Sequence, residues 1–234
     1  MRTKRKLILI STVFGLMLLG GAFWPACGQQ SSDSYWPLTG NAEWITQGWT
    51  VINDHGLSTW QQNGRLRAVG SFEEAHGDWR VIEVSAYFQQ QWGIFGMAFL
   101  RFNDDRIEVL GLSPESFSGS AAEILMPSTG PLSFDLSLDA IDQTQSADFD
   151  VVLGESAVHI QLEVTVESRG LPFETVAGHF DDVLVFNLVI RSSEQGSNEV
   201  ETQSVRIWLA WGHGPIHAEK TKGDRRTGGD FLRN

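Results

Sequence analysis

A strict alternation of apolar and polar residues over 158–167 constrains the fold most. The apolar side chains share one parity and the polar side chains the other: Val158, Ile160, Leu162, Val164 and Val166 against His159, Gln161, Glu163, Thr165 and Glu167. A period of two is that of a β-strand with one face on a core and one in water. Outside the N-terminal leader no stretch of ten or more residues keeps a helical spacing. An all-β fold is therefore expected.

Two further strands are expected within Gly170–Glu219. In Val183–Ile190 only Asn187 is polar, which is typical of a central strand covered on both faces. A polar reversal at 192–198 follows, and a return strand ends at Gly212 and Pro215, because proline cannot donate to a strand ladder.

The rest of the chain gives shorter strand signals at intervals of roughly 8–12 residues. Asn63-Gly64 favours a tight hairpin between Leu57–Gln62 and Arg65–Phe72. Asn103-Asp104-Asp105 marks another turn. Together these signals predict a single antiparallel, strongly curved sheet (half-barrel, barrel or sandwich) over 35–219, with Val183–Ile190 central. The polar, glycine-containing stretch 220–234 is expected to be a disordered tail.

The N-terminus has the layout of an export signal. Four basic residues within positions 1–6 precede an uncharged stretch from Leu7 to Trp24, and the single cysteine, Cys27, follows Ala26. We expect a signal peptide at 1–26, lipidation of Cys27 and a linker at 27–34. Secretion after cleavage at Ala22 and an uncleaved membrane anchor remain alternatives.

Charge and composition exclude some functions. Without the four leader charges the chain has 13 basic and 29 acidic residues, a formal charge of −16, so it should not bind nucleic acid. No catalytic or phosphate-binding motif occurs, and a single cysteine allows no internal disulfide. No enzyme activity, metal or cofactor is expected, although a hydrolase site assembled from distant strands would leave no sequence signal.

Two groups of polar residues are candidate sites. His213 and His217 would lie ~13 Å apart in a strand, too far to share one metal ion. The glycines and the proline around them favour a turn. His179, Asp181 and Asp182 could do acid–base work, but no nucleophile motif accompanies them.

The aromatic residues allow two interpretations. The eight tryptophans after the leader could pack a core, as strand aromatics commonly do. They could also line a groove for an apolar ligand. The candidates for such a lining are Trp92, Phe95, Phe99, Phe102 and Trp208.

Three motifs together resemble those of a group of bacterial cell-envelope β-proteins, many of them lipoproteins. Tyr35-Trp36-Pro37-Leu38-Thr39-Gly40-Asn41-Ala42-Glu43-Trp44 is similar to the opening Tyr-x-Pro-Leu-x-x-Gly-Asn-x-Trp pattern, one residue short in its spacing. The family also has a Pro-Ala-Gly-Thr-Phe stretch that leads into a strand, and Val176-Ala177-Gly178-His179-Phe180-Asp181-Asp182-Val183-Leu184 is similar to it. The segment 208–216 is similar to the closing Trp-x-Ala-x-Gly-x-Gly-x-Val pattern. The resemblance implies a curved antiparallel sheet, loosely like lipoprotein-carrier half-barrels, and no agreed activity.

The expected function is that of an exported bacterial envelope lipoprotein. It would be a non-catalytic binding or carrier module for an apolar ligand, lipid or partner, attached to the membrane by its N-terminal lipid. The alternative is a structural or interaction protein of the envelope with no small-molecule ligand. The oligomeric state stays open.

Overall fold

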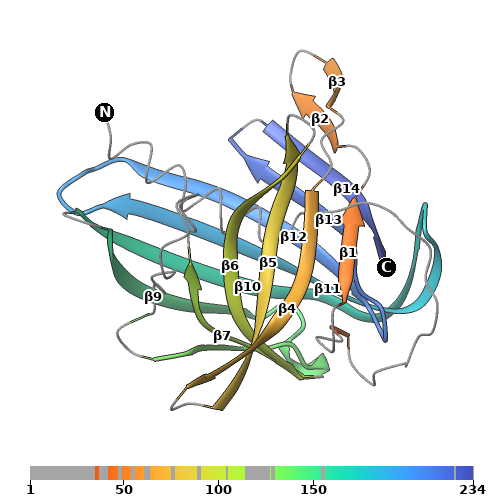
Figure 1. The fold of residues 1–234 in the computed structure, drawn as a ribbon, viewed down its shortest axis with the longest axis horizontal. Helices are drawn as coiled ribbons and strands as arrows, with labels where there is room; N and C mark the ends of the chain where they lie inside the picture. The colour runs from red at the N-terminus through yellow and green to blue at the C-terminus, as the bar shows by residue number, and fades with distance from the viewer. Residues whose placement is uncertain are drawn as a thin grey trace.

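A computed structural model describes residues 35–36, 42–46, 49–53, 56–60, 64–74, 77–88, 91–103, 105–113, 127, 130–153, 156–223 and 225–233. The described residues form a single 14-stranded antiparallel sheet and one short 3-10 helix (Figure 1). Within them, no helix has the length and apolarity needed to cross a membrane. The elements are β1 (Glu43–Thr46), β2 (Trp49–Asn53), β3 (Gly56–Trp60), β4 (Gly64–Glu74), β5 (Gly77–Phe88), β6 (Gln91–Asn103), β7 (Arg106–Ser113), β8 (Leu132–Asp135), η1 (Leu138–Ala140), β9 (Thr144–Leu153), β10 (Ser156–Thr175), β11 (Gly178–Glu194), β12 (Val200–Ala210), β13 (Gly214–Lys222) and β14 (Arg225–Arg233).

The sheet bends until its two ends almost meet. Its order is β8-β7-β6-β5-β4-β1-β14-β13-β12-β11-β10-β9, with β2 paired to β14 and β3 paired to β2. Figure 1 shows β4–β6 crossing in front of β10–β12. The end strands meet at Gln145 of β9 and Asp135 of β8. Gln145 Nε2 donates a hydrogen bond to the Asp135 carbonyl at 2.6 Å, and the Asp135 amide donates one to Gln145 Oε1 at 2.7 Å. The result is a nearly closed barrel, which confirms the predicted fold class.

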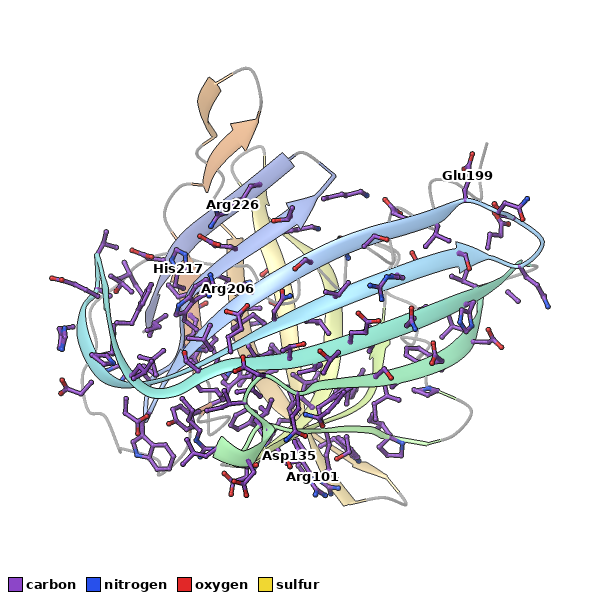
Figure 2. All side chains as sticks on the ribbon, turned by 180° about the vertical axis from the view of Figure 1, so that it is seen from behind. Arg101, Asp135, Glu199, Arg206, His217 and Arg226 are labelled. Atoms are coloured by element: carbon purple, nitrogen blue, oxygen red, sulfur yellow. The ribbon has the colours of Figure 1, made fainter. Side chains whose placement is uncertain are left out.

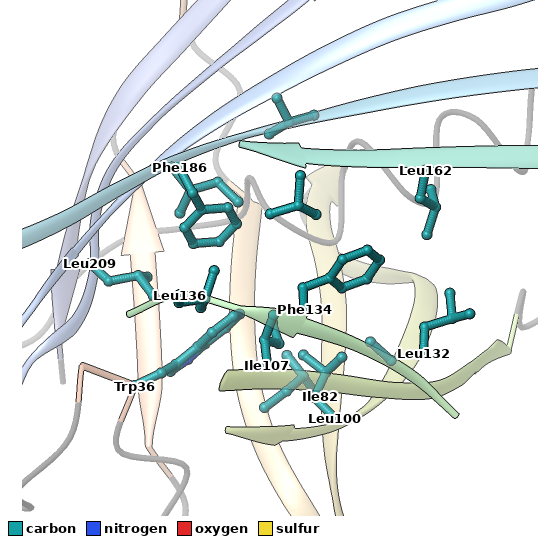
Figure 3. Close-up of a cluster of buried hydrophobic side chains, with 14 of the residues drawn as sticks. Trp36, Ile82, Leu100, Ile107, Leu132, Phe134, Leu136, Leu162, Phe186 and Leu209 are labelled. Atoms are coloured by element: carbon teal, nitrogen blue, oxygen red, sulfur yellow. The ribbon is translucent and has the colours of Figure 1, made fainter. Parts of the chain in front are cut away.

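The main core lies between the two halves of the sheet. All five apolar residues of the predicted alternation in β10 are buried, and they face inward together with Phe186 of β11. They meet side chains of the other half, among them Ile82, Leu100 and Ile107 (Figure 3). The alternation therefore identified a strand with its inner face in the core, as predicted.

Strand β11 is covered on both faces, as its apolar run indicated. Leu184 and Phe186 enter the main core, whereas Val183 and Val185 belong to a second cluster on the outer face. Register shifts in β10 between Val166 and Phe173 bend the β10–β11 hairpin over that outer face. β11 has a neighbour on each side but stands third from the β9 end of the sheet, so it is internal rather than at the midpoint.

The hairpin predicted at Asn63-Gly64 is wrong. β3 pairs with β2, and β4, which begins at Gly64, lies between β1 and β5. An Asn-Gly dipeptide shows only that the chain tends to turn at that point. Which strand pairs with a long strand is decided by which of its side chains must be buried. Leu66 and Ala68 of β4 are buried in the main core, which β1 and β5 help to complete.

The prediction of a disordered tail at 220–234 is also wrong. β13 continues to Lys222, and β14 occupies Arg225–Arg233. β14 pairs with β13 on one side and with β1 and β2 on the other, so it joins the two halves of the sheet. Its composition is polar, but Phe231 is fully buried in the main core, and partners on both edges satisfy its backbone.

Candidate functional site

Three segments far apart in the sequence meet at one end of β11 and β12. The Tyr35 hydroxyl donates a hydrogen bond to the Asp182 carboxylate, and its ring packs edge-on against Trp211 with centroids 5.0 Å apart. Trp44 Nε1 donates to the carbonyl of His213 at 2.6 Å. These are the three segments that the sequence motifs single out, and the fold assembles them into one structural unit.

Gly214 makes the close approach of Trp44 possible. Its φ is +89°, and a Cβ there would lie 2.7 Å from Trp44 Nε1. Because only glycine adopts this backbone at no steric cost and leaves the space free, the glycine fixes the turn between β12 and β13 against the Trp44 ring.

Tyr35 is held in its neutral form. Burial, together with its hydrogen bond to Asp182, raises the pKa of Tyr35 to about 12. The Arg169 guanidinium lies 4.9 Å from the Tyr35 ring centroid and donates to Asp105 Oδ1 at 2.6 Å. At neutral pH Tyr35 is therefore a hydrogen-bond donor that fixes the first motif in place, and it does not serve as a base.

The β10–β11 hairpin is fastened at its tip. The amide of Val176 donates to Asp230 Oδ2 at 2.9 Å, and His217 Nδ1 lies 2.5 Å from Asp230 Oδ1. Burial alone would raise the pKa of Asp230, but the hydrogen bonds from His217 and Val176 outweigh it and lower that pKa. Phe173 packs on Trp208 with centroids 5.5 Å apart.

A pocket of about 330 Å³ lies between the hairpin tip and the β12–β13 turn. Its walls come from the hairpin, from the turn and β13, and from β14: Ala177, His179, Phe180, His213, Pro215, Ile216, Phe231 and Leu232. Phe180 contacts the His213 ring edge-on, with centroids 5.1 Å apart. Two imidazoles are thus set among apolar side chains, an arrangement that can hold a small apolar group and offer it a polar contact.

The chain was compared with known proteins. No protein-family model matches it, and no curated protein matches it significantly. A solved structure from Parabacteroides distasonis ATCC 8503, provisionally described as a lipoprotein, is similar with a TM-score of 0.47 and 10% identity, over 86% of this chain and 98% of that chain. One from Bacteroides fragilis NCTC 9343, provisionally described as an exported protein with a YmcC-like fold, gives a TM-score of 0.42 and 10% identity, over 86% and 98% of the two chains.

The three groove candidates whose side chains the structure describes lie apart from one another. Phe99, 5% exposed, packs with Trp79 and Leu110, and Trp208, 6% exposed, lies in the outer cluster of β11–β13. Phe102 packs against the main core beside Trp36. Trp92 and Phe95 belong to β6, but their side chains lie outside the described residues, as does Cys27. The three side chains that are described occupy three separate clusters.

Three histidines, His179, His213 and His217, lie in or beside the pocket. His213 and His179 line the pocket, whereas His217 is engaged with Asp230. In the part of the chain that the structure describes, no group of three His, Cys, Asp or Glu side chains could hold a metal ion. His179 and Asp181 form an exposed pair at 3.1 Å, and Asp182 accepts the Tyr35 hydroxyl.

Sequence reasoning missed the β14 wall of the pocket. Phe231 and Leu232 fall in the polar stretch expected to be disordered. The only local sign of a buried strand there was that these two apolar residues stand next to each other in an otherwise polar stretch.

Proposed function

We propose that this chain is an exported bacterial envelope lipoprotein, anchored through Cys27, whose β domain is a non-catalytic binding module. The pocket at the tip of the β10–β11 hairpin carries the proposal. Six of its eight described lining residues have apolar side chains, and the second and third motif segments contribute most of the lining. Its volume lies near the lower limit of small-ligand sites, so it suits an apolar ring, a branched chain or an apolar side chain of a partner.

The chemistry around the pocket favours binding over catalysis. A hydrolytic site needs a nucleophile beside a base, and the described residues that form this wall include no hydroxyl or thiol side chain beside the two imidazoles. The pKa of Tyr35, raised to about 12, also makes this phenol a poor base at neutral pH. The hairpin tip, held by Asp230, instead provides a cover for a bound group.

Anchoring through Cys27 would place this site at the membrane surface. The cysteine follows an apolar segment, and the stretch 28–34 is polar and separates it from Tyr35. Several acyl chains, each contributing ~0.8 kcal/mol per buried methylene, would hold the domain there without attraction to anionic lipid.

A fluorescent apolar probe, 1-N-phenylnaphthylamine, tests the pocket on the full chain in non-ionic detergent. The wild type should bind it, and Leu232→Asp should weaken binding at least about tenfold, because a carboxylate would replace part of the apolar wall. Leu171→Asp is the matched control, since Leu171 is exposed on the same hairpin and is not among the lining residues. Equal binding by wild type and Leu232→Asp would contradict the proposal.

A structural or interaction protein of the envelope is the second candidate. The burial of Phe99 and Trp208 in packed clusters favours it, because those aromatics are then part of the core and do not form a ligand surface. This candidate predicts no probe binding by the wild type.

A further inference from the structure

Three exposed apolar side chains, those of Trp211, Leu171 and Leu138, gather around Tyr35. Trp211 is 36% exposed and packs edge-on against the Tyr35 ring. The Arg169 guanidinium lies 4.9 Å from the centroid of the same ring, and Leu171, 57% exposed, follows it by two residues in β10. Arg169 also donates, at 2.9 Å, to the backbone carbonyl two residues before Leu138, which is 64% exposed. The three side chains form an apolar patch at this end of the barrel, the Tyr35 rim.

The other exposed large apolar side chains of the described residues are scattered. Val69 belongs to β4, Val176 to the tip of the β10–β11 hairpin and Val200 to the start of β12. Single exposed apolar residues are common on protein surfaces, whereas a group of them indicates a contact surface. The grouping at the Tyr35 rim therefore calls for a partner.

The N-terminal tether determines which end of the barrel can face a membrane. Cys27 precedes Tyr35 by eight residues, a length that spans at most ~29 Å when fully extended. Val200 precedes Trp211 by eleven residues along β12, which corresponds to ~36 Å in a strand. Figure 2 shows Glu199, the neighbour of Val200, at the far end of the long strands. An anchor at Cys27 therefore holds the Tyr35 rim close to the bilayer, and it is too short to let the domain stand on its Val200 end.

The side chains of the Tyr35 rim suit an uncharged bilayer surface. An indole has a large apolar body and one polar N–H, and tryptophan is accordingly enriched at the level of the lipid head groups. The two leucines add apolar area without a polar group. The described charges beside them include exposed carboxylates: Asp139 follows Leu138, and Asp105 pairs with Arg169 at 2.6 Å. Because anionic lipid repels carboxylates, a zwitterionic phospholipid surface is the partner that fits.

We propose that Trp211, Leu171 and Leu138 form a membrane-contact surface that inserts into the head-group region of a zwitterionic bilayer. The inference rests on the proposed anchoring through Cys27, and it adds that the domain docks on the bilayer with the Tyr35 rim instead of standing off on its linker. His213, which lines the pocket, follows Trp211 by two residues, so docking sets the pocket beside the bilayer.

Fluorine NMR of the full chain, labelled with 5-fluorotryptophan and coupled through Cys27 to a maleimide lipid in phosphatidylcholine bicelles, tests the surface. This coupling supplies the tether whether or not cells acylate the cysteine. A phospholipid with a nitroxide in its upper acyl chain should broaden the signal of Trp211, which Trp211→Phe assigns. Val200→Trp adds an indole at an exposed position at the far end of β12, and its signal should keep its line width.

Leu138→Asp combined with Leu171→Asp should lower the docking equilibrium at least about tenfold, because charged groups replace two apolar ones, and the Trp211 signal should sharpen. Val200→Asp is the matched control: it makes the same change at an exposed apolar position and should leave the broadening in place.

Equal broadening of Trp211 and of the indole added by Val200→Trp, or equal effects of the double variant and Val200→Asp, would overturn the proposal. Broadening of Trp211 in bicelles without acylation of Cys27 in cells would support the contact surface and contradict the natural anchor. The pocket is tested separately, by Leu232→Asp in detergent.

Discussion

At Gly214 a single missing Cβ decides whether Trp44 can reach the β12–β13 turn. Gly214→Ala should lower the free energy of unfolding by about 2 kcal/mol or more, because backbone strain at positive φ adds to a steric clash. Gly196→Ala is the control, since its φ of +83° gives similar strain but nothing lies within 4 Å of the added Cβ. Urea unfolding compares the two. Equal losses would show that the Trp44 contact adds nothing.

The ionisation of Tyr35 can be read directly, because the chain has two tyrosines, Tyr35 and Tyr87. In a Tyr87→Phe background, absorbance titration near 295 nm should give a pKa for Tyr35 of about 12. A raised folded-state pKa means that this contribution to stability is complete below about pH 10 and is lost as pH rises toward 12. Asp182→Asn should lower the pKa part of the way to its usual value, because burial remains. An unchanged pKa in Asp182→Asn would exclude the hydrogen bond.

Among the elements, those with a strong local period were predictable and those defined by their partners were not. The alternation of β10 and the apolar run of β11 reflect burial on one and on two faces, and each is a property of the strand itself. β14 and the partner of β4 depend on which edges are free elsewhere in the sheet. A polar composition and an Asn-Gly dipeptide therefore gave the wrong result at those two places.

β14 should be essential to the fold, although a disordered tail was expected for this stretch. A chain ending at Gly223 would lose the strand that joins β13 to β1, together with Phe231 from the core. We expect it to lose cooperative thermal unfolding, followed by circular dichroism. Removal of Asn234 alone, beyond the end of β14, is the control. An unchanged midpoint in the chain ending at Gly223 would show that the strand does not hold the two halves together.

For the whole molecule, the antiparallel curved sheet was predictable, but the candidate site was less so. The sequence motifs pointed to Phe180, His213 and their neighbours. They did not show which segments come into contact, because pairs such as Tyr35 and Asp182 are 147 positions apart in the sequence. Local periodicity has no information on such pairs. Barrel closure brings them together, and it depends on the full strand order.

Attachment of the whole molecule to a membrane is expected to depend on Cys27. Cys27→Ser should abolish incorporation of labelled palmitate and release the protein from membranes, because the acyl chains supply the anchoring free energy. Labelling followed by membrane fractionation measures both. A Cys27→Ser protein that matures to the same size and stays with the membrane would instead identify Leu7–Trp24 as the anchor.

The most direct test of the pocket as a binding site is fluorine NMR of the full chain labelled with 5-fluorotryptophan. Trp44 and Trp211 adjoin the pocket through His213 and the β12–β13 turn, whereas Trp79 lies in a separate cluster on the other half of the sheet. Single Trp→Phe variants assign the signals. Addition of 1-N-phenylnaphthylamine should shift the signals of Trp44 and Trp211 and leave that of Trp79 in place. A shift of Trp79 alone, or of no signal, would contradict a binding site between the hairpin tip and the β12–β13 turn.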